Sequence, residues 1–311
     1  MRMKTQLFNI LKHMIFLLLF FMCSNVALSQ QDTVYQIGGL NRYDTIPPVK
    51  LEDAHLRVWY EFIYDIKKRS EDKTIKDTMV LVAGNNYSVY YDWNRETKYK
   101  KMLSLLDHAK GITKFITYKS NVGFNEIANN ERQLFEFSLN RDNSEILKNR
   151  TKGLIITTDM DDADIASEKF YLMEEKLPFQ EWQLQDETAE VMGYKCQKAS
   201  CYFKGRNYTA WFTMDIPIND GPYKFYGLPG LILKIEDTDK LFRFTAIGLE
   251  RLENTEIISE SKEDYIKCTP IQYIDIKKRI RETVVQYYSQ GETLYITKIT
   301  LPVKYKSIEI K

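Results

Sequence analysis

Histidine is scarce in this sequence, which limits the catalytic and metal-binding chemistry that the chain can support. The 311 residues include three histidines, and His13 falls in an N-terminal leader that we expect to be removed. His55 and His108 remain, at the start of a predicted strand and the end of a predicted helix. A metal site or a nucleophile–base pair built on histidine would need both, and we interpret them as surface residues.

Motifs of common enzyme classes are also absent. The sequence contains no Gly-x-Ser-x-Gly elbow, phosphate-cradling loop, dinucleotide fingerprint or His-Glu-x-x-His pattern. The acidic run Asp159, Asp161, Asp162 and Asp164 fails the calcium-loop pattern, because Asp164 stands where that loop needs glycine and Phe170 stands at its twelfth position. We therefore predict a solvated acidic turn, no metal and no cofactor.

The chain lacks an excess of either charge. Its 44 basic residues face 43 acidic ones, and loss of Arg2, Lys4 and Lys12 with the leader would bring the net charge slightly below zero. This balance gives no electrostatic case for binding to nucleic acid or to an anionic membrane surface. We expect no nucleic-acid partner.

Long apolar runs are equally rare, and the one near the N-terminus is typical of a signal peptide. Met14–Met22 is apolar, follows basic residues and precedes the cleavage pattern Ala27-Leu28-Ser29. It is too short for a membrane span, which needs about 20 residues. We predict a signal peptide over 1–29. A lipoprotein is not expected, since Met22 rather than a small residue precedes Cys23. The mature protein should be exported, periplasmic or extracellular, and not membrane-spanning.

Three cysteines remain after the leader, Cys196, Cys201 and Cys268, and an exported location permits a disulfide. On one continuous strand, Cys196 and Cys201 would lie on opposite faces and about 17 Å apart. A disulfide needs Cα atoms within about 7 Å. The intramolecular alternatives are therefore Cys268 with Cys196 or Cys268 with Cys201.

Aromatic residues, in contrast, are plentiful at 13% of the chain, and this favours β-sheet. Gly84-Asn85-Asn86 and Gly205 mark hairpin turns, and the charged stretch Lys67–Lys76 predicts a turn. Alternation of apolar and polar residues predicts the following strands: Val58–Ile66, Thr78–Ala83, Tyr87–Tyr91, Gln133–Leu139, Leu154–Thr158, Phe170–Met173, Trp182–Leu184, Tyr194–Lys204, Asn207–Ile216, Leu231–Glu236, Leu241–Gly248 and Leu294–Thr300.

Helical spacing of apolar residues appears at about 95–109 and 271–288. In the second helix, the basic run Lys277-Lys278-Arg279-Arg281 is interpreted as the solvent-facing side. The fold class predicted is mainly β (α+β): a large curved antiparallel sheet or half-open barrel with about two helices packed on it, or alternatively a flat sandwich. An extended lead-in at 30–54 would precede a single β-rich domain at 55–311.

The stretch from Asp220 to Gly230 combines glycine, proline and aromatic residues, and it predicts a rigid turn between two strands. The surrounding aromatics Trp211, Tyr223, Phe225 and Tyr226 are candidate contacts for a peptide, glycan or lipid. Filling of the sheet core is the alternative, and the loop residues Tyr223 and Tyr226 are the preferred contacts.

Two carboxylates near this turn, Asp215 and Asp220, could form an acid–base pair. Both stand where turns commonly place aspartate, because its side chain accepts hydrogen bonds from nearby amides. We favour that interpretation and assign no catalytic residue.

Residues Gly227-Leu228-Pro229-Gly230-Leu231-Ile232 match the motif of the GLPGLI family of exported Bacteroidetes proteins, which this chain resembles. Gly193–Cys196, Thr209–Thr213 and Ile216-Pro217 extend the resemblance. The family has no established activity. The resemblance implies an exported protein with an envelope partner, in association with outer-membrane TonB-dependent uptake systems.

Together these observations lead us to expect a non-catalytic binding or accessory protein of the cell envelope. One alternative is a periplasmic carrier that holds a hydrophobic ligand, such as a lipid, in a concave sheet. The other is a carboxylate-based hydrolase of unfamiliar type that uses Asp215 and Asp220.

Overall fold

We describe the protein from a computed structural model, over residues 49–67, 72–94, 114–120, 134–137, 144–160, 170–253, 257–260, 265–281, 283–290, 293–300 and 308–309. The predicted signal peptide, most of the lead-in, the helix at 95–109 and the acidic positions 161–164 lie outside these ranges. Within them, no helix has the length and hydrophobicity of a membrane span.

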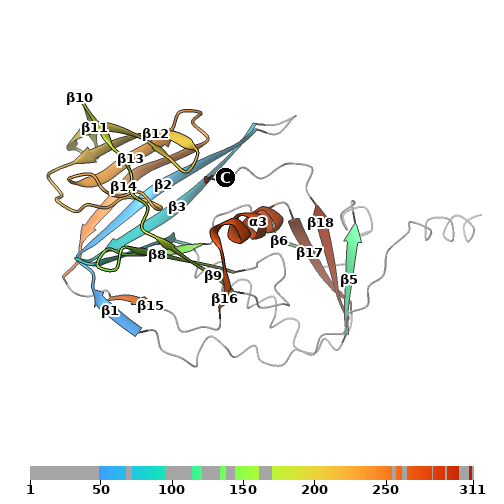
Figure 1. Cartoon of the computed structure of the whole chain (residues 1–311). Coiled ribbons are helices and arrows are strands. Elements are labelled where there is room, and N and C mark those ends of the chain that lie inside the picture. The colour runs from blue at the N-terminus through green and yellow to red at the C-terminus, as the bar shows by residue number, and fades with distance from the viewer. Residues whose placement is uncertain are drawn as a thin grey trace, which may run out of the picture. The chain divides into compact units, whose positions relative to one another are not determined.

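A sheet of twelve strands holds most of the described chain (Figure 1). All neighbouring strands are antiparallel except β9 and β16, which are parallel. In spatial order the strands are β10 (Gln183–Val191), β11 (Tyr194–Phe203), β12 (Arg206–Thr213), β13 (Leu231–Asp237), β14 (Phe242–Arg251), β2 (Leu56–Lys67), β3 (Asp72–Ala83), β4 (Tyr87–Asp92), β7 (Glu145–Asn149), β8 (Leu154–Met160), β9 (Phe170–Lys176) and β16 (Ile266–Cys268).

Two smaller sheets and one helix complete the described elements. β1 (Val49–Asp53) pairs with β15 (Ile257–Glu260), and helix α3 covers Pro270–Arg281. The third sheet has the order β5 (Lys114–Ser120), β18 (Thr293–Thr300), β17 (Thr283–Gln290) and β6 (Leu134–Phe137). The chain forms two compact units, one around residues 111–136 and 285–300 and the other around the large sheet. The domain boundaries predicted from the sequence stay predictions.

Short turns fix the pairing of consecutive strands in the large sheet. Met192 and Gly193, with φ of 53° and 79°, join β10 to β11, and Lys204 and Gly205, with φ of 46° and 84°, join β11 to β12. Two consecutive positive φ angles are the signature of the two-residue turns that match strand twist. The predicted hairpin at Gly84 is confirmed, since its amide donates to the carbonyl of Tyr87 at 2.9 Å.

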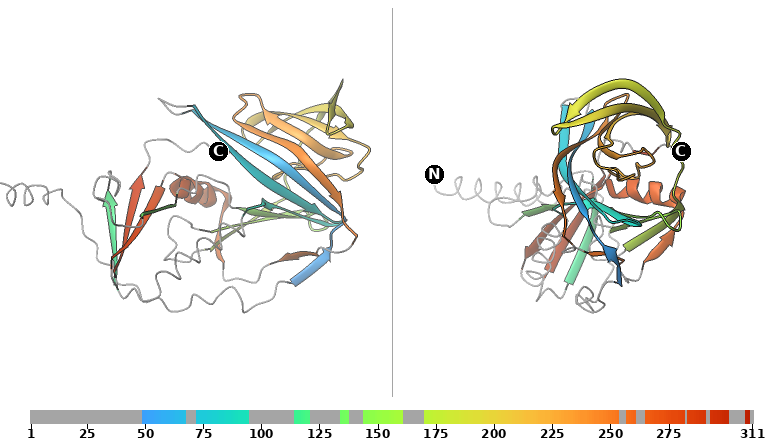
Figure 2. Two further views of the ribbon diagram at one scale, coloured as in Figure 1. Left: turned by 180° about the vertical axis from the view of Figure 1, so that it is seen from behind. Right: turned by 90° about the vertical axis from the view of Figure 1, so that its left-hand side faces the viewer.

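The large sheet curls, so that strands far apart in its order come together. Lys204, at the end of β11, pairs with Glu175 of β9 at 2.8 Å, although these strands are second and eleventh in the order. The segment between β12 and β13 lies inside the curl (Figure 2). Its Phe225 packs among Phe203, Tyr208 and Phe244 of the sheet. The concave face is thus filled by the chain itself.

The coarse fold prediction is confirmed: the protein is mainly β, with a large, mostly antiparallel sheet that is not closed. Several details differ: β1, β5, β15 and β16 were not predicted, and the strand predicted over Asn207–Ile216 ends at Thr213. β3 begins at Asp72, so part of the predicted turn at Lys67–Lys76 is strand. The predicted helix at 271–288 ends at Arg281, because β17 begins at Thr283. β7 was not predicted, and it carries a charged residue of the candidate site.

Helix α3 docks through a buried polar contact rather than an apolar one alone. Lys277 and Asp159 of β8 form an ion pair, and the hydroxyl of Tyr273 donates to the same carboxylate at 3.0 Å. Lys277 is 5% exposed and Asp159 is 6% exposed. The predictions of a solvent-facing basic run and a solvated acidic turn are therefore wrong at these two residues.

Candidate functional site

The candidate site is the segment Met214–Gly230, here called the motif loop, which connects β12 to β13. Backbone hydrogen bonds close its base, from the amide of Leu231 to the carbonyl of Ile216 at 3.1 Å and from Ile232 to Asp220 at 3.0 Å. Position 230 requires glycine because the backbone of Thr213 lies very close to it. A Cβ at this position would lie 2.0 Å from the carbonyl oxygen of Thr213. The loop therefore returns tightly onto the strand that it leaves.

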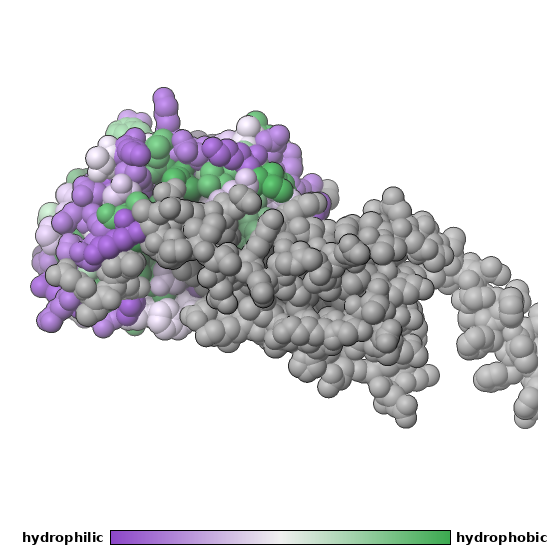
Figure 3. All heavy atoms as spheres, turned by 90° about the horizontal axis from the view of Figure 1, so that it is seen from below, coloured by the Kyte–Doolittle hydropathy of each residue, from purple (hydrophilic) through white to green (hydrophobic). Residues whose placement is uncertain are grey.

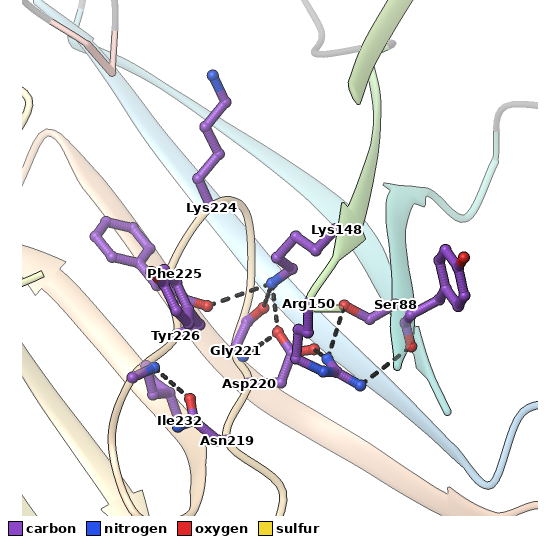
Figure 4. A network of polar contacts seen from close by, with 12 residues as sticks. Ser88, Lys148, Arg150, Asn219, Asp220, Gly221, Lys224, Phe225, Tyr226 and Ile232 are labelled. Carbon is purple, nitrogen blue, oxygen red and sulfur yellow. Dashed lines mark hydrogen bonds and ion pairs between the residues drawn. The ribbon is translucent and has the colours of Figure 1, made fainter. Parts of the chain in front are cut away.

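Asp220 is the charged centre of the motif loop (Figure 4). Its side chain is fully buried and forms ion pairs with Lys148 of β7 and with Arg150, the latter at 2.5 Å. The amide of Gly221 donates to the same carboxylate at 2.8 Å. A buried carboxylate with two cationic partners is fixed in position, and so is the loop that carries it.

The two cations extend this contact to other segments. Lys148 donates to the carbonyls of Gly221 at 2.8 Å and Phe225 at 3.3 Å. Arg150 donates to the carbonyls of Gly84 and Tyr87, at 2.5 and 3.2 Å. Figure 4 shows both side chains converging on Asp220. The cluster Lys148–Arg150–Asp220 thereby ties the motif loop to β7 and to the β3–β4 hairpin.

The protonation of Asp220 follows from these neighbours. Burial alone would raise the pKa of its carboxyl, but the charges of Lys148 and Arg150 outweigh burial and hold the pKa below its usual value. Asp220 is therefore ionised at neutral pH, with its oxygens engaged. A group in this state has no proton to donate and no open position for substrate.

The acid–base pair considered from the sequence is not assembled. Asp215 is exposed, whereas Asp220 is completely buried. An acid–base mechanism would need both carboxylates to face the same substrate, and one exposed and one buried carboxylate do not meet that need. The geometry argues against a hydrolase that uses these two residues.

The predicted contact residues divide between core and surface. Phe225 is fully buried, with its ring centroid 4.7 Å from that of Tyr208. Tyr223 is buried, and its hydroxyl donates to Glu309 at 2.7 Å. Trp211 is half-buried under Lys198, whose Nζ lies 5.9 Å from the ring centroid. Tyr226 is half-buried at the loop surface. Tyr226 and Trp211 thus keep accessible ring surface.

Residues 180–182, just before β10, contact the motif loop through Gln180 and Trp182. Gln180 donates to the carbonyl of Lys224 at 2.7 Å and accepts from the amide of Tyr226 at 3.2 Å. The indole of Trp182 donates to the carbonyl of Tyr226 at 2.8 Å. Gly227 adopts φ of 99° beside that indole. The 180–182 segment thus holds the motif sequence from outside.

Residues on either side of the 180–182 segment are exposed and apolar, and one of them is the most exposed of the large apolar side chains described. Phe179 is 86% exposed, and Leu184 is 54% exposed. Apolar residues lie among polar ones on the face shown in Figure 3. We call Phe179, Trp182, Leu184 and Tyr226 the loop rim. The signal for Phe179 was an aromatic residue directly after Pro178 and before the polar residues Gln180 and Glu181.

The three cysteines are free thiols, so the predicted pairing of Cys268 with Cys196 or Cys201 is not formed. Cys196 and Cys201 lie on β11, at the opposite end of the strand order from Cys268 on β16. Burial raises the pKa of the Cys196 thiol to about 11 and of Cys201 to about 12. His55 is exposed. Within the described ranges, no three acidic, cysteine or histidine side chains gather as metal ligands would.

The filled concave face of the large sheet can be compared with the alternative that the protein carries a hydrophobic ligand there. A carrier of a hydrophobic ligand needs an apolar cavity. Here Tyr223, Phe225 and Leu228 of the motif loop are 8%, 0% and 1% exposed and belong to the same core as the sheet. The loop occupies the space that a ligand would need, which argues against this alternative.

Comparison with known proteins supports the predicted family. Residues 201–234 match the profile of a family described as "Protein of unknown function (Porph_ging)". These residues contain the Gly227–Ile232 motif, so the resemblance to the GLPGLI family is confirmed over this part of the chain. No curated protein matches the chain.

Two solved structures resemble the chain distantly. A structure of PNGF-II in space group P21 has a TM-score of 0.46 and 12% identity, and the match covers 75% of this chain and 34% of that one. A second PNGF-II structure, in space group C2, has a TM-score of 0.43 and 13% identity, with 73% and 34% coverage. The chain thus spans about a third of the PNGF-II chains, and we transfer no function from them.

Proposed function

We propose that this protein is an exported, non-catalytic binding or accessory protein of the cell envelope, and that it contacts its partner through the loop rim. The observation that carries the proposal is Phe179, a large aromatic side chain that is 86% exposed. It stands beside a segment fixed by hydrogen bonds to the motif loop. Exposed aromatics on a rigid support are typical of interaction sites, because little side-chain or loop entropy is lost on binding.

The charged groups of the motif loop support a structural role for it. Asp220 is neutralised by Lys148 and Arg150, and Lys224 pairs with Glu175 and Glu309. Catalytic groups in contrast need access to substrate and a pKa matched to their task. The loop therefore serves as a frame that presents the rim.

The identity of the partner is the finer part of the proposal. We propose an outer-membrane protein of a TonB-dependent uptake system. This part rests on the family resemblance and on the predicted export, and on no contact within the structure.

Site-specific photo-crosslinking in the source bacterium tests both parts. A photoreactive phenylalanine analogue replaces Phe179 in the full chain, and Tyr202 in a control. Tyr202 is a suitable control because it is also a well-exposed aromatic, at 68%, but lies on β11. We expect an envelope protein to be crosslinked at position 179 and not at position 202.

The outcomes test separately whether the loop rim contacts an envelope protein and whether that protein belongs to a TonB-dependent uptake system. An envelope partner from outside an uptake system would overturn the finer part and leave the coarse one. Equal crosslinking at both positions, or none at position 179, would contradict the rim as the contact surface.

A further inference from the structure

A second group of polar side chains lies on the concave side of the large sheet and holds residues near the C-terminus. We call Glu175, Lys204, Tyr208, Tyr223 and Lys224 the tail cradle. They come from β9, the β11–β12 turn, β12 and the motif loop. In Figure 4 the Lys224 side chain points away from the Asp220 cluster, so the two groups are separate. The tail cradle holds Ile308 and Glu309.

The carboxylate of Glu309 is bound by three donors. The Tyr223 hydroxyl donates to Oε1 at 2.7 Å, and Lys224 Nζ lies 2.6 Å from the same oxygen. Lys204 Nζ lies 3.4 Å from Oε2. Charge-assisted hydrogen bonds of this kind are among the strongest in proteins. Glu309 is only 6% exposed, so it is enclosed and not merely attached to a surface lysine.

The preceding residue is bound through both its side chain and its backbone. Ile308 is 6% exposed and belongs to the main apolar core. Its carbonyl accepts a hydrogen bond from the Tyr208 hydroxyl at 3.3 Å. The tail cradle thus contacts an aliphatic side chain, a main-chain carbonyl and a carboxylate in sequence. These are the features by which a peptide segment is recognised.

The charges of the tail cradle require a second carboxylate. Lys204 and Lys224 both pair with Glu175, and Lys224 has a side chain only 1% exposed. With Glu309 removed, two ammonium groups would face a single carboxylate partner. An uncompensated buried charge is strongly unfavourable. Burial raises the pKa of Glu309, but Lys224 and Lys204 outweigh burial and lower it, so the bound form is the carboxylate.

We propose that the tail cradle is a binding site for peptide segments with an aliphatic residue directly before a glutamate, and that Ile308–Glu309 is its intramolecular occupant. Displacement of these residues opens the site to a segment of the same chemistry from another chain. The proposal does not depend on the loop rim. It assigns a ligand class to a different surface.

An occupant from the same chain competes strongly with a free peptide, because its binding is intramolecular. The unmodified chain should therefore bind free peptide weakly. A chain whose own Glu309 no longer fits should bind it well.

Fluorescence polarisation with the full chain provides the test. The probe is the fluorescein-labelled heptapeptide YKSIEIK, which copies the last seven residues, and a matched probe YKSIQIK lacks the carboxylate. The protein variant is Glu309→Lys, which places a third ammonium beside Lys204 and Lys224. We expect this variant to bind YKSIEIK about tenfold or more tightly than the unmodified chain does. YKSIQIK should bind the same variant about tenfold more weakly.

The milder variant Glu309→Gln keeps the test decisive if Glu309→Lys does not fold. Circular dichroism and thermal unfolding establish which variant is native. A folded variant that binds YKSIEIK no more tightly than the unmodified chain would overturn the proposal. Equal binding of the two peptides would overturn it as well. If neither variant folds, Ile308–Glu309 is a permanent part of the core, and the proposal is again wrong.

Discussion

Asp220 is the residue whose substitution tests the motif loop most directly. In Asp220→Asn, Lys148 and Arg150 lose the buried carboxylate between them. We expect the free energy of unfolding to fall by about 3–5 kcal/mol. Asp215→Asn is the matched control, because Asp215 lies in the same loop but is exposed, and it should change the free energy by less than about 0.5 kcal/mol. Urea unfolding measures both, and equal effects would contradict the clamping role of Asp220.

The contribution of Asp220 should also depend on pH. Its folded pKa lies below the ordinary value, so its stabilising contribution is present above the unfolded pKa of about 3.9. The contribution is lost as the pH falls from there through the folded pKa. We expect the difference in unfolding free energy between the unmodified chain and Asp220→Asn to shrink as the pH falls below about 4. A difference that does not shrink on this acidic side would contradict this assignment.

The thiols offer a further test at the level of single residues. Since the thiolate is the reactive form, burial that raises the pKa of Cys196 and Cys201 makes them unreactive. Burial also raises the pKa of Cys268, which is less enclosed. At pH 8 we expect a thiol reagent to modify Cys268 first and the other two after unfolding, as followed by mass spectrometry. Rapid modification of Cys196 in the folded protein would contradict its burial.

The residues of the candidate site were only partly predictable from sequence. Asp220 stood out because it precedes Gly221-Pro222. Its partner Lys148 lies 72 positions away in sequence, in a short strand whose charged residue looks solvent-facing. Nothing local indicates that such a lysine is buried, because burial depends on the partner that tertiary folding supplies. Tyr223 and Phe225 were recognised as notable aromatics, but their burial follows from the curl of the sheet.

Among the elements, the motif loop and the β10–β11 turn each need a glycine, for different reasons. Gly230 is limited by space, because its Cβ would meet the backbone of Thr213. Gly193 in the β10–β11 turn is limited by conformation, with φ of 79° and open space around it. We expect Gly230→Ala to lower the free energy of unfolding by about 3 kcal/mol or more, because backbone must move. Gly193→Ala should cost about 1–2 kcal/mol. Denaturant unfolding that ranks them in reverse would contradict the close approach at Gly230.

The alternation of apolar and polar residues in the sequence correctly predicted most strands of the large sheet. The end of the second helix was predicted less well. The hairpins at Gly84 and Gly205 were found because turn residues act locally. The second predicted helix ran past Arg281 because Val284 and Tyr287 also fit a helical spacing. In the structure these β-branched and aromatic residues belong to β17, which pairs with β18. β17 also lies beside the distant strand β6, so pairing within the sheet decided between helix and strand there.

At the scale of the large sheet, a charged contact joins two strands of the curl that are not paired with each other. β11 and β9 are not hydrogen-bonded neighbours, yet Lys204 joins them through Glu175. The same carboxylate binds Lys224 of the motif loop. Burial lowers the pKa of Lys204, but Glu309 and Glu175 outweigh burial and raise it, so Lys204 stays charged through neutral pH. Glu175 therefore connects two parts of the sheet and the loop enclosed between them.

Glu175→Gln tests this closure against an exposed pair on the same sheet. We expect the variant to lose about 3 kcal/mol of unfolding free energy, since the buried Lys224 loses one of its two carboxylate partners. Glu187→Gln is the control, because Glu187 pairs with Lys198 with 64% of its side chain exposed, and it should cost less than about 1 kcal/mol. Amide hydrogen exchange shows which parts of the sheet are destabilised. Faster exchange should appear in β9 and at the β11–β12 turn in Glu175→Gln alone. Exchange that rises equally in both variants, or only within β9, would mean that strand pairing and apolar packing hold the curl without this contact.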